Sequence, residues 1–441
     1  MSRLVRLLGL LAVVVACLPA EVASAAALSY PVTTTADSGA GSLRTSIEAA
    51  NAHTGVDSIP IEVAGTIELE GALPAVADDL AISGPGASSL TIERNADTEF
   101  RIFDFGDGLT ASLNGVTVSG GADPQGGGIR NGNGSLTLTR VVVAGNEATA
   151  EEGTQLVAEG GGVLSEGPLT VRESAIRDNK ALAKGGTTSG FALGAGIMAR
   201  GALTVQRSTI SGNAAVALGE GGKQTGALGG GLRVIGAPAI VELSTISGNS
   251  VLADKSLTTE ARGGGLQGDE LTLTSSTVTG NSLFSNGFAA GANIEFGGTT
   301  LIRNTIVADP LGAADSCGNG LPPGAGFSSG GFNLDEDGSC GFEGATDLSA
   351  VVAGVDPVLR DNGGPTPTHA LLAGSAALDR GSAFGSTIDQ RGLPRPSDFA
   401  SISNSEGGDG SDIGAFELQV PPPAAGGGPV LVTAAPADRT P

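Results

Sequence analysis

The stretch Asn333–Gly338 has the residue types and spacing of half a cation site. It reads Asn-Leu-Asp-Glu-Asp-Gly, with oxygen ligands at alternate positions before a glycine turn, as in the first half of a calcium-binding loop. The twelfth position, where such a loop supplies a bidentate glutamate, is Gly344, and the nearest glutamate is Glu343. An Asp/Gly turn beside a disulfide accounts for the same residues. We therefore predict no metal site and no cofactor, with calcium binding as the alternative interpretation.

The adjacent carboxylates Asp78 and Asp79 suggest a second kind of chemistry, glycoside hydrolysis. Inverting hydrolysis needs two carboxylates about 6.5–9.5 Å apart across a cleft. Nothing in the sequence places a second acidic pair near these residues, and the histidines His53 and His369 lie elsewhere. We predict that the aspartates form a surface turn.

A third pattern is a column of charged residues at one position of a repeat. Its members are, in order, Arg140, Glu173, Arg207, Leu243, Ser275 and Arg303. Polysaccharide lyases on β-helices use arginine or lysine as a base, but no cluster of carboxylates converges on this column. A stacked Arg-Glu-Arg instead predicts ion pairs between neighbouring strands, each worth about 0.2–1 kcal/mol when exposed. We predict no catalytic residue.

The repeat that carries this column has a period of 34 or 35 residues, marked by glycine openers at Gly126, Gly160, Gly194, Gly229 and Gly263, with a worn copy at Gly291. Each opener precedes an alternating run such as Leu-Thr-Leu-Thr, which is typical of a short, half-buried strand. A unit of three short strands cannot bury its apolar face alone, whereas stacked units share one core. We predict an all-β fold, a right-handed parallel β-helix. A β-propeller, the alternative, would need a fourth strand in each unit.

Each repeat ends in an asparagine, and the five are Asn146, Asn179, Asn213, Asn249 and Asn281. Asparagine tolerates left-handed turn conformations, and stacked amides hydrogen-bond along a ladder. We predict that these side chains form a structural ladder, with a polar ligand track as the alternative.

The variable parts of the repeat lie between each terminal asparagine and the next opener, at 147–159, 180–193, 214–228, 250–262 and 282–290. Because they insert at the same point of each coil, we predict loops on one side of the rod, where repeat proteins often bind partners. Their apolar residues either form a binding surface or pack the loops together: Leu156, Phe191, Leu218, Leu252, Phe284 and Phe288. The pattern does not say which residues would bind a ligand.

The N-terminus predicts export. In residues 1–25, arginines precede an apolar run and a small-residue cleavage site, as in a secretory signal peptide. The alternative is a lipoprotein lipidated at Cys17. After cleavage Cys317 and Cys340 remain, and an even pair in an oxidising compartment predicts a disulfide.

The composition excludes some partners. A net charge of −23 argues against nucleic acid, whose binding needs a basic surface. After the signal peptide no stretch reaches the ~18–20 apolar residues of a membrane span. We expect a monomer that does not span a membrane.

The predicted organisation continues with an N-terminal segment at 26–57, β-helix repeats at 58–309, a smaller C-terminal domain at 310–420 and a disordered Pro/Gly/Ala-rich tail at 421–441. A helix at 42–52 begins at the N-cap Ser42 and places Leu43, Ile47 and Ala50 on one face. We expect this helix to cap the open end of the solenoid core.

Several motifs resemble families of exported β-helix proteins. The stretch 42–51, SLRTSIEAAN, followed by strands and Gly-Pro-Gly, resembles bacterial proteins with a CSLREA-type start, although Gly41 stands where those proteins carry cysteine. The paired GGG and GN signals resemble the short repeats of polymorphic outer-membrane proteins. Motifs at 332–342, 361–381, 389–396 and 412–418 resemble the choice-of-anchor Q domain, with Ser411 in place of a frequent cysteine and no anchor expected after them.

The resemblance implies an exported or cell-surface β-helix protein without a defined activity. We therefore predict a structural or adhesion-type scaffold, not an enzyme, that uses its loop face to bind a polysaccharide or another cell-surface ligand. The alternative is a polysaccharide lyase or glycoside hydrolase on the same fold. Such an enzyme would need carboxylates and arginine or lysine converging from neighbouring coils.

Overall fold

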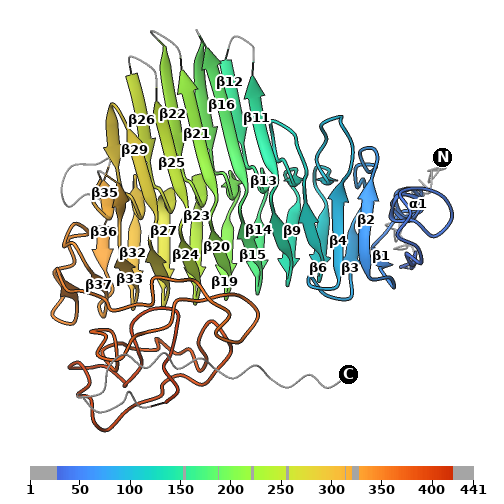
Figure 1. Cartoon of the computed structure of the whole chain (residues 1–441). Helices are drawn as coiled ribbons and strands as arrows, with labels where there is room; N and C mark the ends of the chain where they lie inside the picture. The colour runs from blue at the N-terminus through green and yellow to red at the C-terminus, as the bar shows by residue number, and fades with distance from the viewer. Residues whose placement is uncertain are drawn as a thin grey trace, which may run out of the picture.

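The computed structural model describes residues 27–420, apart from 152–154, 187, 220–222, 255–257, 313 and 320–326. The predicted signal peptide, Cys17 and the tail at 421–441 lie outside the described residues. The chain forms a solenoid in which all pairs of named strands are parallel, with a taller array of strands on one side (Figure 1). The predicted parallel β-helix is confirmed.

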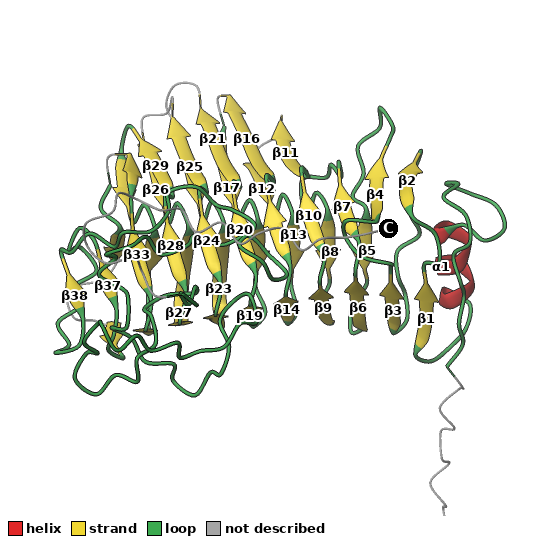
Figure 2. Ribbon diagram, turned by 60° about the horizontal axis from the view of Figure 1, so that its bottom comes forward, coloured by secondary structure: helices red, strands yellow, loops and turns green. Residues whose placement is uncertain are grey.

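The first coil is closed by helix α1, Leu43–Asn51, which lies at the end of the solenoid beside β1 (Figure 2). The hydroxyl of Ser42 accepts a hydrogen bond from the backbone N–H of Thr45, so it caps the helix as predicted. Leu43, Ile47 and Ala50 are buried against the solenoid core. The helix therefore shields apolar side chains that would otherwise meet water.

Two long sheets form the body of the solenoid. The first contains 16 strands: β1 (Asp57–Pro60), β3 (Leu80–Ser83), β5 (Phe103–Phe105), β6 (Thr110–Asn114), β8 (Ile129–Asn131), β9 (Ser135–Thr139), β13 (Val163–Ser165), β14 (Leu169–Arg172), β18 (Ile197–Ala199), β19 (Leu203–Gln206), β23 (Leu232–Glu242), β27 (Leu266–Thr274), β31 (Ile294–Phe296), β32 (Thr300–Arg303), β35 (Cys317–Asn319) and β36 (Phe327–Ser329).

The second sheet contains 11 strands: β2 (Gly65–Leu69), β4 (Leu90–Arg94), β7 (Thr117–Ser119), β10 (Val142–Ala144), β15 (Ala175–Arg177), β20 (Thr209–Ser211), β24 (Thr245–Ser247), β28 (Thr277–Thr279), β33 (Ile306–Ala308), β37 (Leu334–Asp335) and β38 (Leu348–Ser349). Equivalent apolar residues stack from coil to coil. Ile176, Ile210 and Ile246, for example, are register partners and fully buried. Strands β34 to β38 pair with these sheets and the fin described next, so the paired strands continue past the predicted end at Asp309.

The inserts form two further sheets, which we call the fin. One holds β11 (Glu147–Glu151), β16 (Lys180–Gly186), β21 (Ala214–Gly219), β25 (Ser250–Asp254), β29 (Ser282–Ser285) and β34 (Leu311–Gly312). The other holds β12 (Gln155–Glu159), β17 (Ser189–Leu193), β22 (Gln224–Leu228), β26 (Thr258–Arg262) and β30 (Phe288–Ala290).

The prediction of loops in the inserts is wrong, although they do emerge on one side of the rod (Figure 1). Alternate positions of the fin strands are mostly alanines, which form one buried cluster with a few larger side chains. Each insert also finds an in-register partner in the next coil, so its backbone hydrogen bonds are satisfied along the stack. Small side chains and regular spacing thus turn the inserts into strands.

The terminal asparagines lie in one buried column. The Nδ2 of Asn146, Asn179, Asn213 and Asn249 each donates to the Oδ1 of the next asparagine at 2.9 Å. The same Oδ1 atoms accept from backbone N–H groups, and each Nδ2 also donates to a core carbonyl. Asn281 continues the column to Asn293, which the repeat pattern does not place there. A parallel row of buried serines, Ser174, Ser208, Ser244 and Ser276, accepts from the backbone of the preceding coil.

Residues 350–420 contain little regular structure and lie along the outer face of the second sheet (Figure 1). Gln390 bonds Thr209 and Thr245, and the backbone N–H of Ala415 donates to Thr277, so three successive strands hold this segment. The ion pair between Arg395 and Glu417 is fully buried at 2.7 Å. The outward-facing threonines of the repeat are therefore buried beneath this segment.

Candidate functional site

A cavity of about 450 Å³ lies on the outer face of the fin, among the last three inserts. It is lined by Gln224 of β22, by Thr258, Thr259, Glu260 and Arg262 of β26, and by Gly287 and Phe288 at the start of β30. Phe288 is 48% exposed although it is a large apolar side chain. The cavity combines an exposed aromatic ring with charged groups, hydroxyls and an amide, which can stack on a ligand and hydrogen-bond to it.

The glycine openers set the shape of the corner behind this cavity. Gly263 turns the chain from β26 into β27 with φ of 59°, which glycine adopts without strain. A Cβ there would lie 2.7 Å from the Cβ of Gln267, so only glycine allows the two strands to approach this closely. The turn places Arg262 of the fin beside Gln267 of the first sheet.

Arg262 is the charged centre of the corner. Its guanidinium pairs with Glu260 on its own strand and with Glu295 of β31 at 2.9 Å. The guanidinium also stacks over the ring of Phe288, 4.4 Å from its centroid. Burial lowers the pKa of Arg262, but its hydrogen bonds and charge interactions with the two glutamates outweigh that effect and raise it overall. Arg262 is therefore a cation whose Nε and Nη1 are bonded to two glutamates.

Glu295 belongs to a row that runs along the outer face of the first sheet. Register partners in this row are Leu164, Met198, Arg233, Gln267 and Glu295. Glu295 is 2% exposed, and burial raises the pKa of its carboxyl despite the pairing with Arg262. Its Oε2, the Oε1 of Gln267 and the Nε of Arg233 have no hydrogen-bond partner among the described residues.

Arg233 forms no ion pair within the described part of the chain. Burial lowers its pKa to about 10, while the charges of Glu159, Glu295 and other nearby carboxylates oppose that shift. Further along the corner, Arg200 pairs with Glu159 at 2.6 Å and with Glu166 at 2.7 Å. Of the three corner arginines, Arg233 alone is desolvated without a bonded carboxylate among the residues that the structure describes.

Two other cavities border the fin. One of about 370 Å³ lies on the opposite side of Phe288 and is lined by Phe288, Ala289, Ala290, Gly291, Phe296, Asp315, Cys317, Gly318 and Ser339. Another of about 550 Å³ lies at the first fin strands and is lined by Glu99, Pro124, Thr149, Ala150, Glu151, Leu156 and Val157.

The predicted column of arginines forms ion pairs rather than a site. Glu173 pairs with Arg207 and, at 3.9 Å, with Arg140. The assignment of Arg303 to this column is wrong by one residue, because Arg303 is the register partner of Thr274. Asn304 takes the left-handed position next to Ser275, with φ of 48°. The worn repeat is one residue out of phase at that point.

The early aspartates support turns. Asp78 accepts hydrogen bonds from the backbone N–H groups of Gly55 and Asp79, which lower its pKa. Asp79 accepts from the backbone N–H of Thr110 at 2.6 Å. His53 contacts the carboxylate of Asp57 at 3.0 Å beside the capping helix. These residues have structural roles.

His369 lies where residues 350–420 dock on the solenoid. Its Nδ1 is 2.6 Å from the carbonyl oxygen of Asp356, so Nδ1 carries the proton, and its Nε2 accepts from the hydroxyl of Ser247 at 2.7 Å. Burial lowers the pKa of His369, although Asp356 opposes the shift. The serine and histidine are oriented as a nucleophile and base would be, but both are buried in the docking interface.

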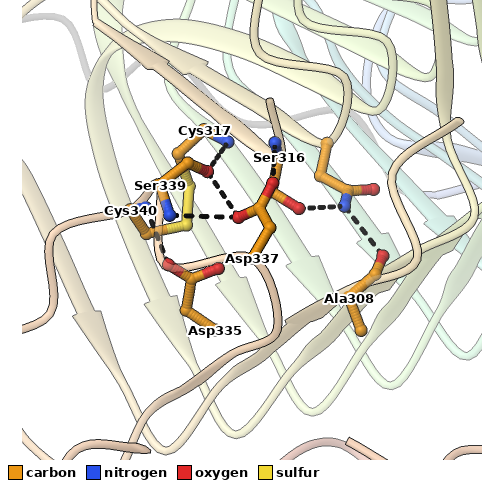
Figure 3. The surroundings of a disulfide bond; sticks show 8 residues. Ala308, Ser316, Cys317, Asp335, Asp337, Ser339 and Cys340 are labelled. Carbon is orange, nitrogen blue, oxygen red and sulfur yellow. Dashed lines mark hydrogen bonds between the residues drawn. A yellow bond between two sulfur atoms is a disulfide. The ribbon is translucent and has the colours of Figure 1, made fainter. Parts of the chain in front are cut away.

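The calcium-like stretch folds around the disulfide (Figure 3). Cys317 and Cys340 are bonded, as predicted. Asp335 accepts from the backbone N–H of Cys340, and Asp337 accepts from Ser316 and Ser339. Asn333 instead joins the serine row, accepting from the backbone N–H of Thr305. No group of three or more metal-ligating side chains occurs in the described ranges.

Sequence reasoning missed Arg233, Gln267 and Glu295. Each stands four residues after a glycine opener, at Gly229, Gly263 and Gly291. That fixed offset, combined with a charged or amide side chain where Leu164 and Met198 stand in earlier coils, is the signal that would have found them.

No family model matches the chain, and neither does any curated protein. Among solved structures, the catalytic unit of a thermostable GH87 α-1,3-glucanase from Streptomyces thermodiastaticus strain HF3-3 has 16% sequence identity, with 69% of this chain and 68% of the glucanase covered and a TM-score of 0.26. The Agl-KA catalytic domain has 14% identity, with 59% and 54% covered and a TM-score of 0.22. TM-scores this low carry no conclusion about activity.

Proposed function

We propose that the protein is a secreted or cell-surface scaffold without enzymatic activity that binds a polysaccharide in the fin cavity. The observation that carries the proposal is the cavity of about 450 Å³ built by three consecutive inserts around Phe288, Glu260 and Arg262. Repetition of the inserts creates this face. A purely structural surface does not require an exposed aromatic ring beside hydroxyls, whereas a sugar can stack on the ring and hydrogen-bond to the hydroxyls.

Export is supported by the signal-like sequence at 1–25 and by the disulfide, which persists in oxidising compartments. Within the ranges that the structure describes, no helix has both the length and the apolar character needed to cross a membrane. The resemblances to CSLREA-type and choice-of-anchor Q proteins fit a surface location. We infer that residues 350–420 lock the solenoid rather than bind the ligand.

A glycoside hydrolase is the second candidate. Glu260 lines the cavity, both Glu260 and Glu295 bond Arg262, and burial raises the pKa of Glu295, as it does for a general acid. A lyase has less support, because Arg207 is committed to Glu173. The hydrolase would release reducing ends, and Glu295→Gln would abolish that release.

The test is a panel of insoluble polysaccharides incubated with the full secreted chain, with and without calcium, measuring retention and released reducing ends. The scaffold predicts retention without cleavage. Glu260→Ala should reduce retention, whereas Glu147→Ala, which removes an exposed fin carboxylate paired with Lys180, should not. Cleavage lost in Glu295→Gln would replace the scaffold with the hydrolase, and absence of both retention and cleavage on every polymer would reject both.

A further inference from the structure

Phe288 separates two cavities that follow one another along the solenoid. The cavity of about 450 Å³ lies among β22, β26 and the start of β30, and the cavity of about 370 Å³ among β30, β31 and β35. Both volumes lie within the ~300–1,000 Å³ typical of small-ligand sites. Phe288 lines both cavities and is half exposed, so a ligand can lie on both sides of the ring.

The order of the strands shows that the two cavities follow one another along the solenoid axis. Strands β26 and β30 are register partners, and β31 pairs with β35 in the next coil. A ligand that fills both cavities must therefore extend along the solenoid axis and cross Phe288. A linear polymer meets that requirement, whereas a compact ligand would fill one cavity only.

The charges in the two linings argue against an acidic ligand. Each cavity contains one carboxylate, Glu260 in the first and Asp315 in the second. The one guanidinium in the linings, Arg262, is already bonded to Glu260 and Glu295. Among the described lining residues, an anionic sugar would meet two carboxylates and one guanidinium whose charge two glutamates already balance, which disfavours its binding.

The remaining polar groups suit hydroxyls. Gln224 and Thr258 each offer both a donor and an acceptor, whereas the hydroxyl of Ser339 already donates to Asp337 and can only accept. The two carboxylates also accept. A sugar hydroxyl also donates and accepts, so an uncharged sugar can satisfy these groups without bringing a charge into the site.

We propose that the two cavities form one extended site for an uncharged linear polysaccharide, with sugar units on both sides of Phe288. This inference rests on the proposed function, because it names the ligand class of the same site.

The experiment begins with retention of the full secreted chain on uncharged polymers (α- and β-glucans, mannan, xylan, galactan) and on acidic ones (alginate, pectate, hyaluronan). Oligosaccharides of one to eight units from the uncharged polymer retained best are then titrated by calorimetry. We expect affinity to rise at least ~10-fold from the shortest oligomer that binds to one that spans both cavities.

Asp315→Ala should reduce that gain with length, because Asp315 lines the second cavity and a long oligomer must fill both. Asp361→Ala, a change at an exposed turn of residues 350–420, should leave the gain unchanged. Retention on acidic polymers alone, or affinity independent of length, would overturn the inference and keep the proposed binding function. Absence of retention on every polymer would reject the proposed function itself.

Discussion

Two rows of polar side chains run along the solenoid, and they differ in how completely they are bonded. In the asparagine ladder, every Nδ2 from Asn146 to Asn249 reaches the Oδ1 of the next coil at the same distance. In the row of Arg233, Gln267 and Glu295 at the base of the fin, each side chain retains an atom without a described partner.

The difference follows from residue identity. An amide repeated at one coil position donates upward and accepts from below, so a single residue type satisfies itself along the whole stack. Three different side chains in successive coils cannot match one another in this way. The regular row holds the fold together, whereas the irregular row lies behind the cavity where we place the ligand.

Breaking the ladder should give the largest effect. Asn213→Ala removes the acceptor of two donors on Asn179 and leaves the buried carbonyl of Ile176 without its bond. We expect a loss of about 3 kcal/mol or more in the free energy of unfolding, because buried polar groups lose their partners. Urea unfolding measures it. The exposed Asn95→Ala serves as control, and a change in Asn213→Ala no larger than in that control would contradict a structural ladder.

Asp335, two residues after Asn333 of the serine row, should make the free energy of unfolding depend on pH, which the uncharged asparagine ladder does not. Burial raises the pKa of Asp335 to about 7, and Asp337 adds to the shift while the N–H of Cys340 opposes it. An unfolded aspartate titrates near ~3.9, so the stabilising contribution of neutral Asp335 is complete below that pH and is lost as pH rises towards 7.

The expected loss for Asp335 is on the order of 1–2 kcal/mol after allowance for solvent screening. Urea unfolding of wild type and Asp335→Asn between pH 4 and pH 8 measures it, and the variant should show a flatter profile. The exposed Asp97→Asn should keep the wild-type profile. Parallel profiles for wild type and Asp335→Asn would show that burial does not hold Asp335 neutral.

Removing a polar side chain from the row of Arg233, Gln267 and Glu295 should stabilise the protein, whereas removing one from the asparagine ladder should destabilise it. Arg233→Met replaces a desolvated guanidinium with the side chain that Met198 already provides one coil earlier, and we expect stabilisation of about 1 kcal/mol. Arg130 is the register partner of Leu164 at the start of the same row and pairs with Asp104 at 2.9 Å, so Arg130→Met should be neutral or slightly destabilising. Thermal unfolding compares the two variants. Destabilisation by Arg233→Met would mean that this guanidinium is bonded in solution.

Most of the fold could be predicted from the sequence, because glycine openers, alternating runs and terminal asparagines repeat with one period. The fin could not, since the sequence alone predicts loops for runs such as Ala214–Gly219, and their strand character depends on equivalent runs in neighbouring coils. For Phe288 the sequence leaves open whether the ring binds a ligand or packs the inserts together, and the structure shows a half-exposed ring that lines two cavities. Arg262 and Glu295 come together only through the fold, being 33 residues apart.

The most direct test of the binding face is the affinity of Phe288→Ala and Phe284→Ala for the polysaccharide that the wild type retains best. Both rings belong to the last full insert and are about equally exposed, at 48% and 52%, but Phe284 lies on the other sheet of the fin. We predict at least ~10-fold weaker binding for Phe288→Ala, wild-type binding for Phe284→Ala and similar unfolding midpoints for both. Equal affinity of the two variants would contradict a binding site at Phe288.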